Sequence, residues 1–493
     1  MQENEPQNLA FYWCTLFVRS LFEEGVRNVV ISPGSRSTPL TLAFSAHSGI
    51  NKTIAVDERS AGFIALGQAK ASGVPSVLVC TSGTALANYS PAVFEATTSG
   101  TPIIIASADR PPHLRGLGAS QTIDQIKIFG NQTVYFHEAG EPSTKSPNQK
   151  RIQVAAKQAV VNSIEHHGVS HINFAFDKPF EPEADFLKSI EKENHNHSKR
   201  SQTDYSQHLN ETELGEKFWS QLISAEKPLI IVGPKSVNTD LDFITPLARA
   251  LSAPIIAEPG SNIPSSKHII SGYSGFLKDS DYRELLKPDL VIRAGAFPTS
   301  KGVQELLADC EGVHQIAFSD HNLPNYGNFP VDRTVHLKSS LAIPDVNGNA
   351  APTWLKEWKK ISKKYSSFLI DNINPSTPLT DGFIFKEAAD LIPKKSFLML
   401  SNSFPIRDLA LFSDFSGQEI YVNRGAAGID GILSTTIGLS SVLKKTSVLF
   451  IGDIAFLHDI NALLHARNVT EPLVIIVLNN GGGTIFRMLP IYK

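Results

Sequence analysis

Two polar clusters near the end of the 493-residue chain contain the residue types of a magnesium and phosphate site. Asp453 follows the apolar run 447–451, and Asn480 follows the apolar run 472–478. Both runs suit buried parallel strands, and the apolar residues between them recur at helical spacing. Such a strand-helix-strand unit brings the carboxyl ends of its strands together, where open α/β sheets bind ligands. Carboxylate and carbonyl oxygens suit Mg²⁺, and the start of the helix predicted after Asp453 suits a phosphate.

Each cluster also has a simpler interpretation. Asp453 alone is typical of a helix N-cap, and the Asn-Asn-Gly sequence at 479–481 is typical of a turn. Together, at this spacing, the two clusters resemble the thiamine-diphosphate motif, which begins Gly-Asp-Gly and ends Asn-Asn. The third position of that motif is Ile454 here rather than glycine, which restricts the subfamilies that match.

Glu58 is a candidate for proton transfer. We expect a strand over 53–56 and a helix over 59–70, which places Glu58 at the junction between them. An acid in a first helical turn is also favoured by the helix dipole alone. A bound thiamine diphosphate, however, needs a carboxylate that exchanges a proton with its aminopyrimidine ring. Glu58 is the best-placed carboxylate for this role in the first third of the chain.

Two more loops follow predicted strands in the same region. Residues 32–39 read Ser-Pro-Gly-Ser-Arg-Ser-Thr-Pro after a strand over 29–32, and residues 81–84 read Thr-Ser-Gly-Thr after a strand over 76–80. Both loops are suited to cap a following helix, and both could donate backbone N–H groups to a ligand.

Composition narrows the class of protein. Hydrophobic residues make up 42% and charged residues 19%, which permits large buried cores. The net charge of −3 gives no indication of nucleic acid or membrane binding. The three cysteines lack metal-ligand spacing, and the acidic segment 1–7 has no signal-peptide pattern. We therefore expect a cytoplasmic protein with no integral membrane segment.

Alternating strand and helix signals predict an α/β protein with three doubly wound parallel-sheet domains. We expect an N-terminal domain over 8–180, a polar linker over 181–212, a central domain over 213–342 and a third domain over 354–493. A parallel sheet of this kind usually continues with a further helix and strand, so we expect the third domain to be incomplete at Lys493. Further strands are predicted over 102–106, 229–232, 254–257, 290–293, 315–318, 397–400 and 419–422, and helices over 59–70 and 85–99, with a kink at Pro91.

Longer motifs in all three predicted domains resemble one family. They include Val30-Ile31-Ser32-Pro33-Gly34-Ser35-Arg36-Ser37-Thr38-Pro39-Leu40, Asp57-Glu58-Arg59-Ser60-Ala61, Ala108-Asp109-Arg110-Pro111-Pro112 and Asn423-Arg424-Gly425-Ala426. The chain resembles the 2-succinyl-5-enolpyruvyl-6-hydroxy-3-cyclohexene-1-carboxylate (SEPHCHC) synthases, thiamine-diphosphate enzymes of menaquinone biosynthesis. The resemblance implies a pyruvate decarboxylase-like fold.

The resemblance also implies an activity. Enzymes of this family are transferases that decarboxylate 2-oxoglutarate and add the resulting succinyl carbanion to isochorismate. They use thiamine diphosphate with Mg²⁺, for which Mn²⁺ can substitute. Their active sites lie between the first domain of one subunit and the third domain of another, so that a homodimer is the smallest active assembly and homotetramers are common.

Site residues follow from the resemblance position by position. It implies Glu58 as the catalytic carboxylate and Asp453, Asn480 and the Gly482 carbonyl as metal ligands. The implied cofactor-binding residues are Ser35, Glu58, Ser82, Gly83, Ile429, Gly452, Asp453 and Asn480. Both substrates are dicarboxylates, which several cations would recognise. The implied substrate-binding residues are Arg36, Arg110, Gln121, Lys301, Ser403, Arg407 and Arg424. Many relatives have a second basic residue after the lysine, where this chain has Gly302.

Two alternatives stay open at this point. One is another thiamine-dependent enzyme, such as a 2-oxo acid decarboxylase or an acetolactate synthase. The motifs around Arg110 and Arg424 disfavour it. The other is a non-catalytic nucleotide-binding protein on the same fold, which the fold alone does not exclude. The presence of Glu58, Asp453 and Asn480 together disfavours this second alternative.

Overall fold

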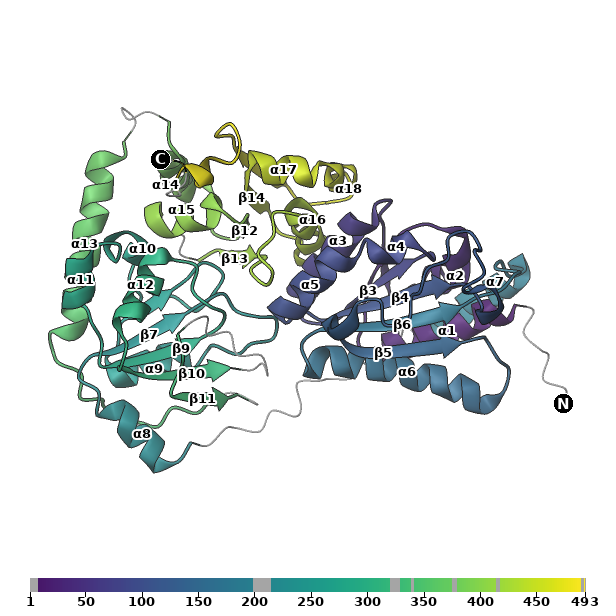
Figure 1. The fold of residues 1–493 in the computed structure, drawn as a ribbon, viewed down its shortest axis with the longest axis horizontal. Coiled ribbons are helices and arrows are strands. Elements are labelled where there is room, and N and C mark those ends of the chain that lie inside the picture. The colour runs from purple at the N-terminus through teal and green to yellow at the C-terminus, as the bar shows by residue number, and fades with distance from the viewer. Residues whose placement is uncertain are drawn as a thin grey trace. The chain divides into compact units, whose positions relative to one another are not determined.

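The computed structural model describes residues 8–197, 214–319, 329–337, 341–374, 379–413, 417–488 and 492 (Figure 1). Within this part of the chain lie three sheets whose strand pairs are all parallel, with helices between the strands. The prediction of an α/β protein with three parallel sheets is therefore confirmed. The described residues form two compact units: the first comes from 8–197, 425–444 and 457–471, and the second from the described parts of 214–424, 445–456 and 472–492.

The first unit is built on a six-stranded sheet in the order β2-β1-β3-β4-β6-β5. Helices α1 and α6 cover one face, and α3 and α5 cover the other (Figure 1). Trp13 and Phe17 of α1 are fully buried against strand residues such as Val79. The strands are β1 (Asn28–Ile31), β2 (Asn51–Ile54), β3 (Ser76–Cys80), β4 (Ile103–Asp109), β5 (Thr133–Gly140) and β6 (Val169–Ala175). The helices are α1 (Leu9–Glu23), α2 (Thr38–Ser45), α3 (Glu58–Ser72), α4 (Thr84–Ala87), α5 (Ser90–Ser99), α6 (Ser146–Glu165) and α7 (Ala184–His197).

The same unit contains α16 (Ile432–Leu443), which packs along α3 at backbone distance. A Cβ added at Gly67 would lie 2.1 Å from the carbonyl oxygen of Thr435, and one added at Gly438 would lie 2.1 Å from that of Ile64. Any larger residue at either glycine would force the helices apart. The close contact therefore depends on the small size of these two glycines and not on their conformational freedom.

Two predictions for this unit were wrong in detail. The helix expected over 85–99 is divided into α4 and α5, because Pro91 begins a helix here and does not kink one: it lies in the first turn of α5, where its missing N–H costs nothing. The strand expected over 53–56 is β2 (Asn51–Ile54), shifted two residues toward the N-terminus. The other strands predicted in this region are confirmed to within a few residues.

Part of the predicted polar linker is helical. Helix α7 lies inside the range 181–212, and its Ile190 is buried in the core of the first sheet. Asn194 is fully buried, where its side chain donates to the carbonyl of Ala46 (3.2 Å) and accepts from Arg19 (2.6 Å). The few apolar residues lie on one face of the helix, which a composition argument cannot detect. The remainder of the predicted linker, like the segment 1–7, lies outside the described residues.

The second unit contains a five-stranded sheet in the order β11-β10-β9-β7-β8. One face is covered by α8 and α9, and the other by α10, α12 and α13. The strands are β7 (Pro228–Val232), β8 (Ile255–Ala257), β9 (Leu290–Ala294), β10 (His314–Ser319) and β11 (Arg333–His336). The helices are α8 (Glu216–Ile223), α9 (Ile244–Leu251), α10 (Tyr273–Phe276), α11 (Ser280–Leu285), α12 (Lys301–Asp309) and α13 (Trp354–Asn372). The four strands predicted here are confirmed.

Helix α13 begins where the third domain was expected to begin, yet it packs on the central sheet. Trp354 and Trp358 are buried in the core beneath that sheet, and the Trp354 indole donates to the carbonyl of Pro228 (2.8 Å). This packing favours a domain boundary after α13 rather than before it. The domain boundaries themselves stay a prediction.

The second unit also contains a four-stranded sheet in the order β13-β12-β14-β15. Its strands are β12 (Phe397–Leu400), β13 (Glu419–Val422), β14 (Ser447–Gly452) and β15 (Leu473–Leu478), all of which the sequence predicted. Helices α14 (Asp381–Leu391) and α15 (Phe404–Phe412) bury Phe385 and Ile406 against one face.

The prediction of a single helix after Asp453 is wrong. The chain forms three short pieces instead: α17 (Asp453–His458), η5 (Ile460–Ala462) and α18 (Leu463–Ala466). Ile460 and Leu464, whose spacing predicted a buried helical face, are 45% and 59% exposed. Asp459 interrupts the helix because its carboxylate turns to Ser434 at the start of α16, accepting from both the backbone N–H (2.7 Å) and the hydroxyl (2.9 Å).

Candidate active site

The first unit gathers six predicted site residues around one cavity of about 500 Å³. They come from loops that follow β1, β2, β3 and β4, neighbouring strands of the same sheet. Because these strands are parallel, their carboxyl ends open at one edge, which is where such sheets bind ligands. The six residues are Ser35, Arg36, Glu58, Ser82, Arg110 and Gln121.

Glu58 is the first residue of α3, and its neighbours hold that position. Asp57 caps the helix by accepting from the N–H of Ser60 (3.1 Å), and its other oxygen accepts from Asn461 (2.8 Å). Arg59 donates to the carbonyl of His458 (2.9 Å). Glu58 itself is half-buried at the cavity wall. Its carboxylate is therefore on a rigid helix start and open to a ligand.

Two guanidinium groups lie in the wall of the same cavity. Arg110 donates to the hydroxyl of Ser82 (2.9 Å) and to the carbonyl of Ser120 (2.7 Å), while Arg36 donates to the carbonyl of Phe176. Both arginines are more than nine-tenths buried. Burial, together with the like charge of Arg110, lowers the pKa of Arg36. Two buried guanidinium groups in the wall of one cavity favour the binding of an anionic ligand.

The loop after β3 is held by residues that sequence reasoning missed. The N–H of Gly83 donates to Gln125 (2.9 Å), and Gln125 donates in turn to Asn173 (2.9 Å). Asn173 donates to Asp109 (2.9 Å), which directly precedes Arg110. Gln125 and Asn173 are fully buried and lie far from these loops in sequence, so no local pattern marked them.

Ile429, predicted to contact the cofactor, is in the first unit but does not line this cavity. It follows a loop that Glu95 of α5 holds through the backbone. The Glu95 carboxylate accepts from the N–H groups of Gly425 (2.9 Å), Ala426 (2.7 Å) and Ala427 (3.3 Å). Burial raises the pKa of Glu95, against which the three N–H donors and the charge of Lys70 act.

Three predicted substrate-binding residues lie together in the second unit. Ser403 directly precedes α15 and has a positive φ of 72°, a conformation that is costly for a residue other than glycine. Arg407 donates to the carbonyl of Ser403, and Arg424 donates to the side chain of Asn402 (2.9 Å). Asn402 also donates to the carbonyl of Asn423 (2.8 Å). Sequence reasoning missed Asn402, although its place directly after a predicted strand could have marked it.

Lys301 is the first residue of α12. Its side chain is 71% exposed and lies 3.7 Å from Glu305, one turn further along the helix. No described contact joins Lys301 directly to Arg407 or Arg424.

The predicted metal ligands lie at the carboxyl ends of β14 and β15. Gly452 is paired with Leu478 in the sheet, so Asp453 and Asn480 follow adjacent strand ends. Gly482 has a φ of 84°, which turns the chain after Asn480. A Cβ at Gly452 would meet nothing within 4 Å, so the space beside this strand end is open. An Asp carboxylate, an Asn amide oxygen and a backbone carbonyl are the hard donors that fit Mg²⁺.

No group of three or more His, Cys, Asp or Glu side chains suited to a metal occurs in the described ranges. A metal bound here would therefore depend on amide and carbonyl oxygens as well as on Asp453. The predicted helix start that was to bind phosphate is the six-residue helix α17, shorter than expected. Asp453 accepts from the N–H of Ile454 (2.8 Å).

Comparison with known proteins defines the class first. Residues 14–128, which include the loops around Ser35, Glu58, Ser82 and Arg110, match the family model of the N-terminal TPP binding domain of thiamine pyrophosphate enzymes. The chain thus has the cofactor-binding domain of a thiamine-diphosphate enzyme.

Curated relatives narrow the class to one family. The chain is 35% identical to a SEPHCHC synthase of Oceanobacillus iheyensis over 96% of this chain and 83% of that protein. It is 35% identical to one of Bacillus velezensis (97% and 84%) and 36% identical to one of Prosthecochloris aestuarii (97% and 84%). The chain belongs to the SEPHCHC synthase family, and the predicted resemblance is confirmed. Among the described helices, none has the length and apolar character needed to cross a membrane.

Proposed function

We propose that this chain decarboxylates 2-oxoglutarate and joins the remaining four-carbon unit to isochorismate, forming SEPHCHC for menaquinone biosynthesis. The observation that carries the proposal is the cavity of the first unit, where Glu58 lies with Arg36 and Arg110. A carboxylate for proton exchange beside two buried cations suits a thiamine enzyme that acts on dicarboxylates. A simple decarboxylase of small 2-oxo acids would not need both arginines.

The cofactor would be held at both of its ends. Ser35, Glu58, Ser82 and Gly83 would contact the ring end, with Ile429 beside it, while Gly452, Asp453 and Asn480 would contact the diphosphate end. Mg²⁺, or Mn²⁺ in its place, would be bound by Asp453, Asn480 and the Gly482 carbonyl. When bound, thiamine diphosphate supplies the electron sink that makes decarboxylation possible. The role of Glu58 is to hold and exchange one proton at a ring nitrogen.

The substrate residues would divide their work by charge. Arg36, Arg110, Lys301, Arg407 and Arg424 would bind the carboxylates of the two substrates, and Gln121 and Ser403 would orient them by hydrogen bonds. Ser82 fixes the orientation of the Arg110 guanidinium group, and Asn402 fixes that of Arg424. Guanidinium groups held in this way are suited to bind a carboxylate through two hydrogen bonds.

The active assembly would be a homodimer or a homotetramer, the two assemblies that the family resemblance implies. The active site would lie between subunits. A reduced cytoplasmic location is supported by Cys14, Cys80 and Cys310, all of which are buried and unpaired with one another.

The test is direct. The protein is mixed with thiamine diphosphate, Mg²⁺, 2-oxoglutarate and isochorismate, and the product is identified by mass. The expected product has the mass of SEPHCHC and requires all four components. Release of CO₂ from 2-oxoglutarate without any adduct would identify a simple decarboxylase instead, and no turnover with either substrate would refute the proposal.

A further inference from the structure

A buried carboxylate that the proposed function does not use lies next to the start of α12. Glu258 follows β8 and is only 2% exposed. Its Oε2 accepts from the N–H of Thr299 (2.9 Å), and both its oxygens lie 3.3 Å from the N–H of Ser300. The next residue is Lys301. The side chain of Ser300 does not cap the helix, because its hydroxyl donates to Ser274 (3.0 Å). Glu258 therefore supplies the cap of α12 from a distant strand end.

The same carboxylate is within the electrostatic field of the two predicted substrate arginines. Burial raises the pKa of Glu258 to about 7, while the two N–H donors and then the positive charges of Arg424 and Arg407 act to lower it. A helix cap alone needs neither a buried charge nor cations beside it, since Ser, Thr or Asn would serve. Glu258 differs from these residues because it is buried, comes from a distant strand end and lies within the field of two arginines.

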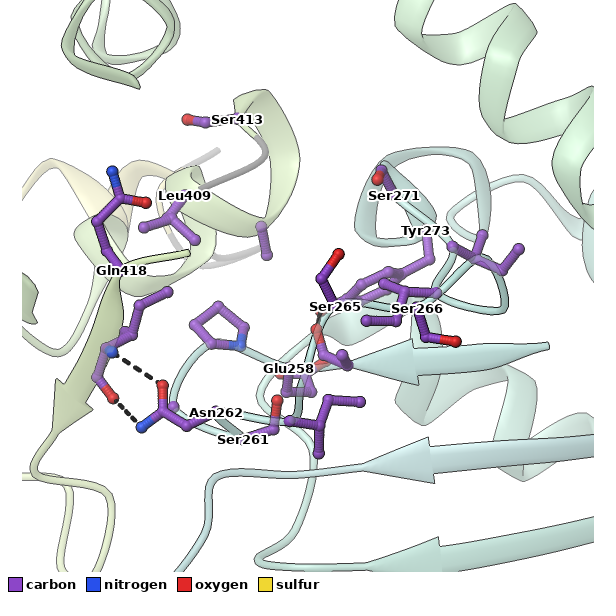
Figure 2. A pocket seen from close by; sticks show the side chains of 18 of the residues that line it. Glu258, Ser261, Asn262, Ser265, Ser266, Ser271, Tyr273, Leu409, Ser413 and Gln418 are labelled. Carbon is purple, nitrogen blue, oxygen red and sulfur yellow. Dashed lines mark hydrogen bonds between the residues drawn. The ribbon is translucent and has the colours of Figure 1, made fainter. Parts of the chain in front are cut away.

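The loop that carries Glu258 is fixed against the third sheet. The side-chain amide of Asn262 donates to the carbonyl of Ile420 and accepts from its N–H, both at 2.8 Å (Figure 2). A Cβ added at Gly260 would lie 2.9 Å from a methyl group of Val422, and the φ of Gly260 is +89°. The side chain of Asn262 thus pairs with the edge strand β13 as a neighbouring strand would. Arg424 lies two residues after Val422, the last residue of that strand.

Glu258 also lines a cavity of about 230 Å³ on this side of the loop. Figure 2 shows Glu258 and Tyr273 on the wall next to the five-stranded sheet, with Leu409 and Gln418 on the wall next to the four-stranded sheet. Among the described residues, no lysine or arginine lines this cavity, which distinguishes it from the arginine cluster around Asn402. Glu258 is therefore the only side chain of this cavity, among the described residues, that also caps α12.

We propose that Glu258 is a positioning residue for the dicarboxylate substrates. Through its hydrogen bonds to the N–H groups of Thr299 and Ser300, it fixes the backbone from which Lys301 projects. This inference rests on the proposed function, since it assigns Lys301 and the two arginines to substrate binding. Glu258 touches neither substrate nor cofactor, and acts through the start of α12.

The experiment compares Glu258→Gln with wild type in steady-state kinetics, measuring KM for 2-oxoglutarate and isochorismate separately. Gln keeps one acceptor oxygen but loses the charge and the second acceptor. We expect KM for at least one substrate to rise by about 10-fold, as for the loss of one charge-assisted hydrogen bond, with kcat within about 2-fold of wild type. Asp279→Asn is the control, because Asp279 also caps a helix of this unit with a carboxylate (2.9 Å to the N–H of Asp281) but is a local cap of α11. It should leave both KM values unchanged.

A double-mutant cycle tests whether Glu258 acts through Lys301. In a Lys301→Ala background, Glu258→Gln should raise KM by less than about 2-fold further, since the group that it positions is already gone. Fully additive effects, an unchanged KM in the single variant, or a fall in KM would overturn the inference; a fall would mean that Glu258 competes with the substrates.

Thermal unfolding of Glu258→Gln is measured first, and Glu258→Asp, which keeps the charge, replaces it if the glutamine variant does not fold. The aspartate variant should then show the same selective rise in KM, to a smaller extent, and an unchanged KM in that variant would equally overturn the inference. A wild-type protein that makes no SEPHCHC refutes the proposed function itself, whereas an active wild type with unaffected variants refutes only the role of Glu258.

Discussion

Glu95 and Ala426 are joined by a 2.7 Å hydrogen bond from the backbone N–H to the carboxylate, although 331 positions separate them in the chain. The same carboxylate accepts from Gly425 and Ala427, so one buried side chain binds three successive residues of a loop. A Cβ added at Gly425 would lie 2.6 Å from the carbonyl oxygen of Glu95, which explains the glycine. The family motif at 423–426 is therefore partly a requirement for docking this loop.

Glu95→Ala should lower the free energy of unfolding by about 2–4 kcal/mol, because three backbone N–H groups lose their acceptor in a buried place. Urea unfolding measures the change. Glu165→Ala, at the exposed end of α6, is the control and should alter stability by less than about 0.5 kcal/mol. Equal stabilities of the two variants would show that the loop does not depend on Glu95.

Glu58→Gln should retain cofactor binding and lose turnover. The amide has the shape of the carboxylate but cannot exchange the proton, so kcat should fall by about 10²–10⁴-fold. Calorimetry with thiamine diphosphate and Mg²⁺ measures binding, and CO₂ release from 2-oxoglutarate measures turnover. Near-normal CO₂ release by this variant would mean that another carboxylate serves the ring.

Asp453→Ala should abolish binding of thiamine diphosphate in the presence of Mg²⁺, because the only charged ligand of the proposed metal is removed. Calorimetric titration with and without a chelator measures the effect in both proteins. Wild type should lose its affinity when the chelator is added, and the variant should show none in either condition. Cofactor affinity that survives the chelator in wild type would rule out a metal bridge.

Asp408 should make stability depend on pH. It is 5% exposed, and burial followed by the negative charge of Asp381 raises its pKa to about 7 from an ordinary 3.8. The folded protein then keeps a proton that the unfolded chain loses, so this group's contribution to stability decreases as pH rises from about 4 to about 7. Asp408→Asn should be more stable than wild type at pH 8, and the difference should shrink toward pH 4.

Thermal unfolding across this pH range measures the effect of Asp408. Asp390→Asn on α14, at an exposed position, is the control and should follow wild type at every pH. A difference between Asp408→Asn and wild type that stays constant from pH 4 to pH 8 would contradict the assignment.

The pattern of apolar runs and polar loops was enough to predict the three parallel sheets and part of the candidate site. Short apolar runs have one regular structure available when both faces of a sheet are covered, and the polar residues directly after them must meet at the carboxyl edge. Glu58 and the loops 32–39 and 81–84 could be found in this way because each lies within a few residues of the strand that positions it, whereas Arg110 was assigned from the family resemblance. The order of the strands adds only which of these loops are neighbours.

Which polar groups are buried, and which partners hold them, depends on packing that local sequence patterns do not record. Glu95, Asn173 and Glu258 are marked by no local pattern, because their partners lie tens to hundreds of residues away. Composition placed α7 in a linker, and the Pro/Asn/Gly-rich segment before α13 placed that helix in the third domain. The packing of neither helix could be predicted in this way, because composition does not show which face of a helix packs against an apolar surface. Burial is a property of the packed chain, and it determines both the pKa of a carboxylate and whether a backbone N–H needs it as an acceptor.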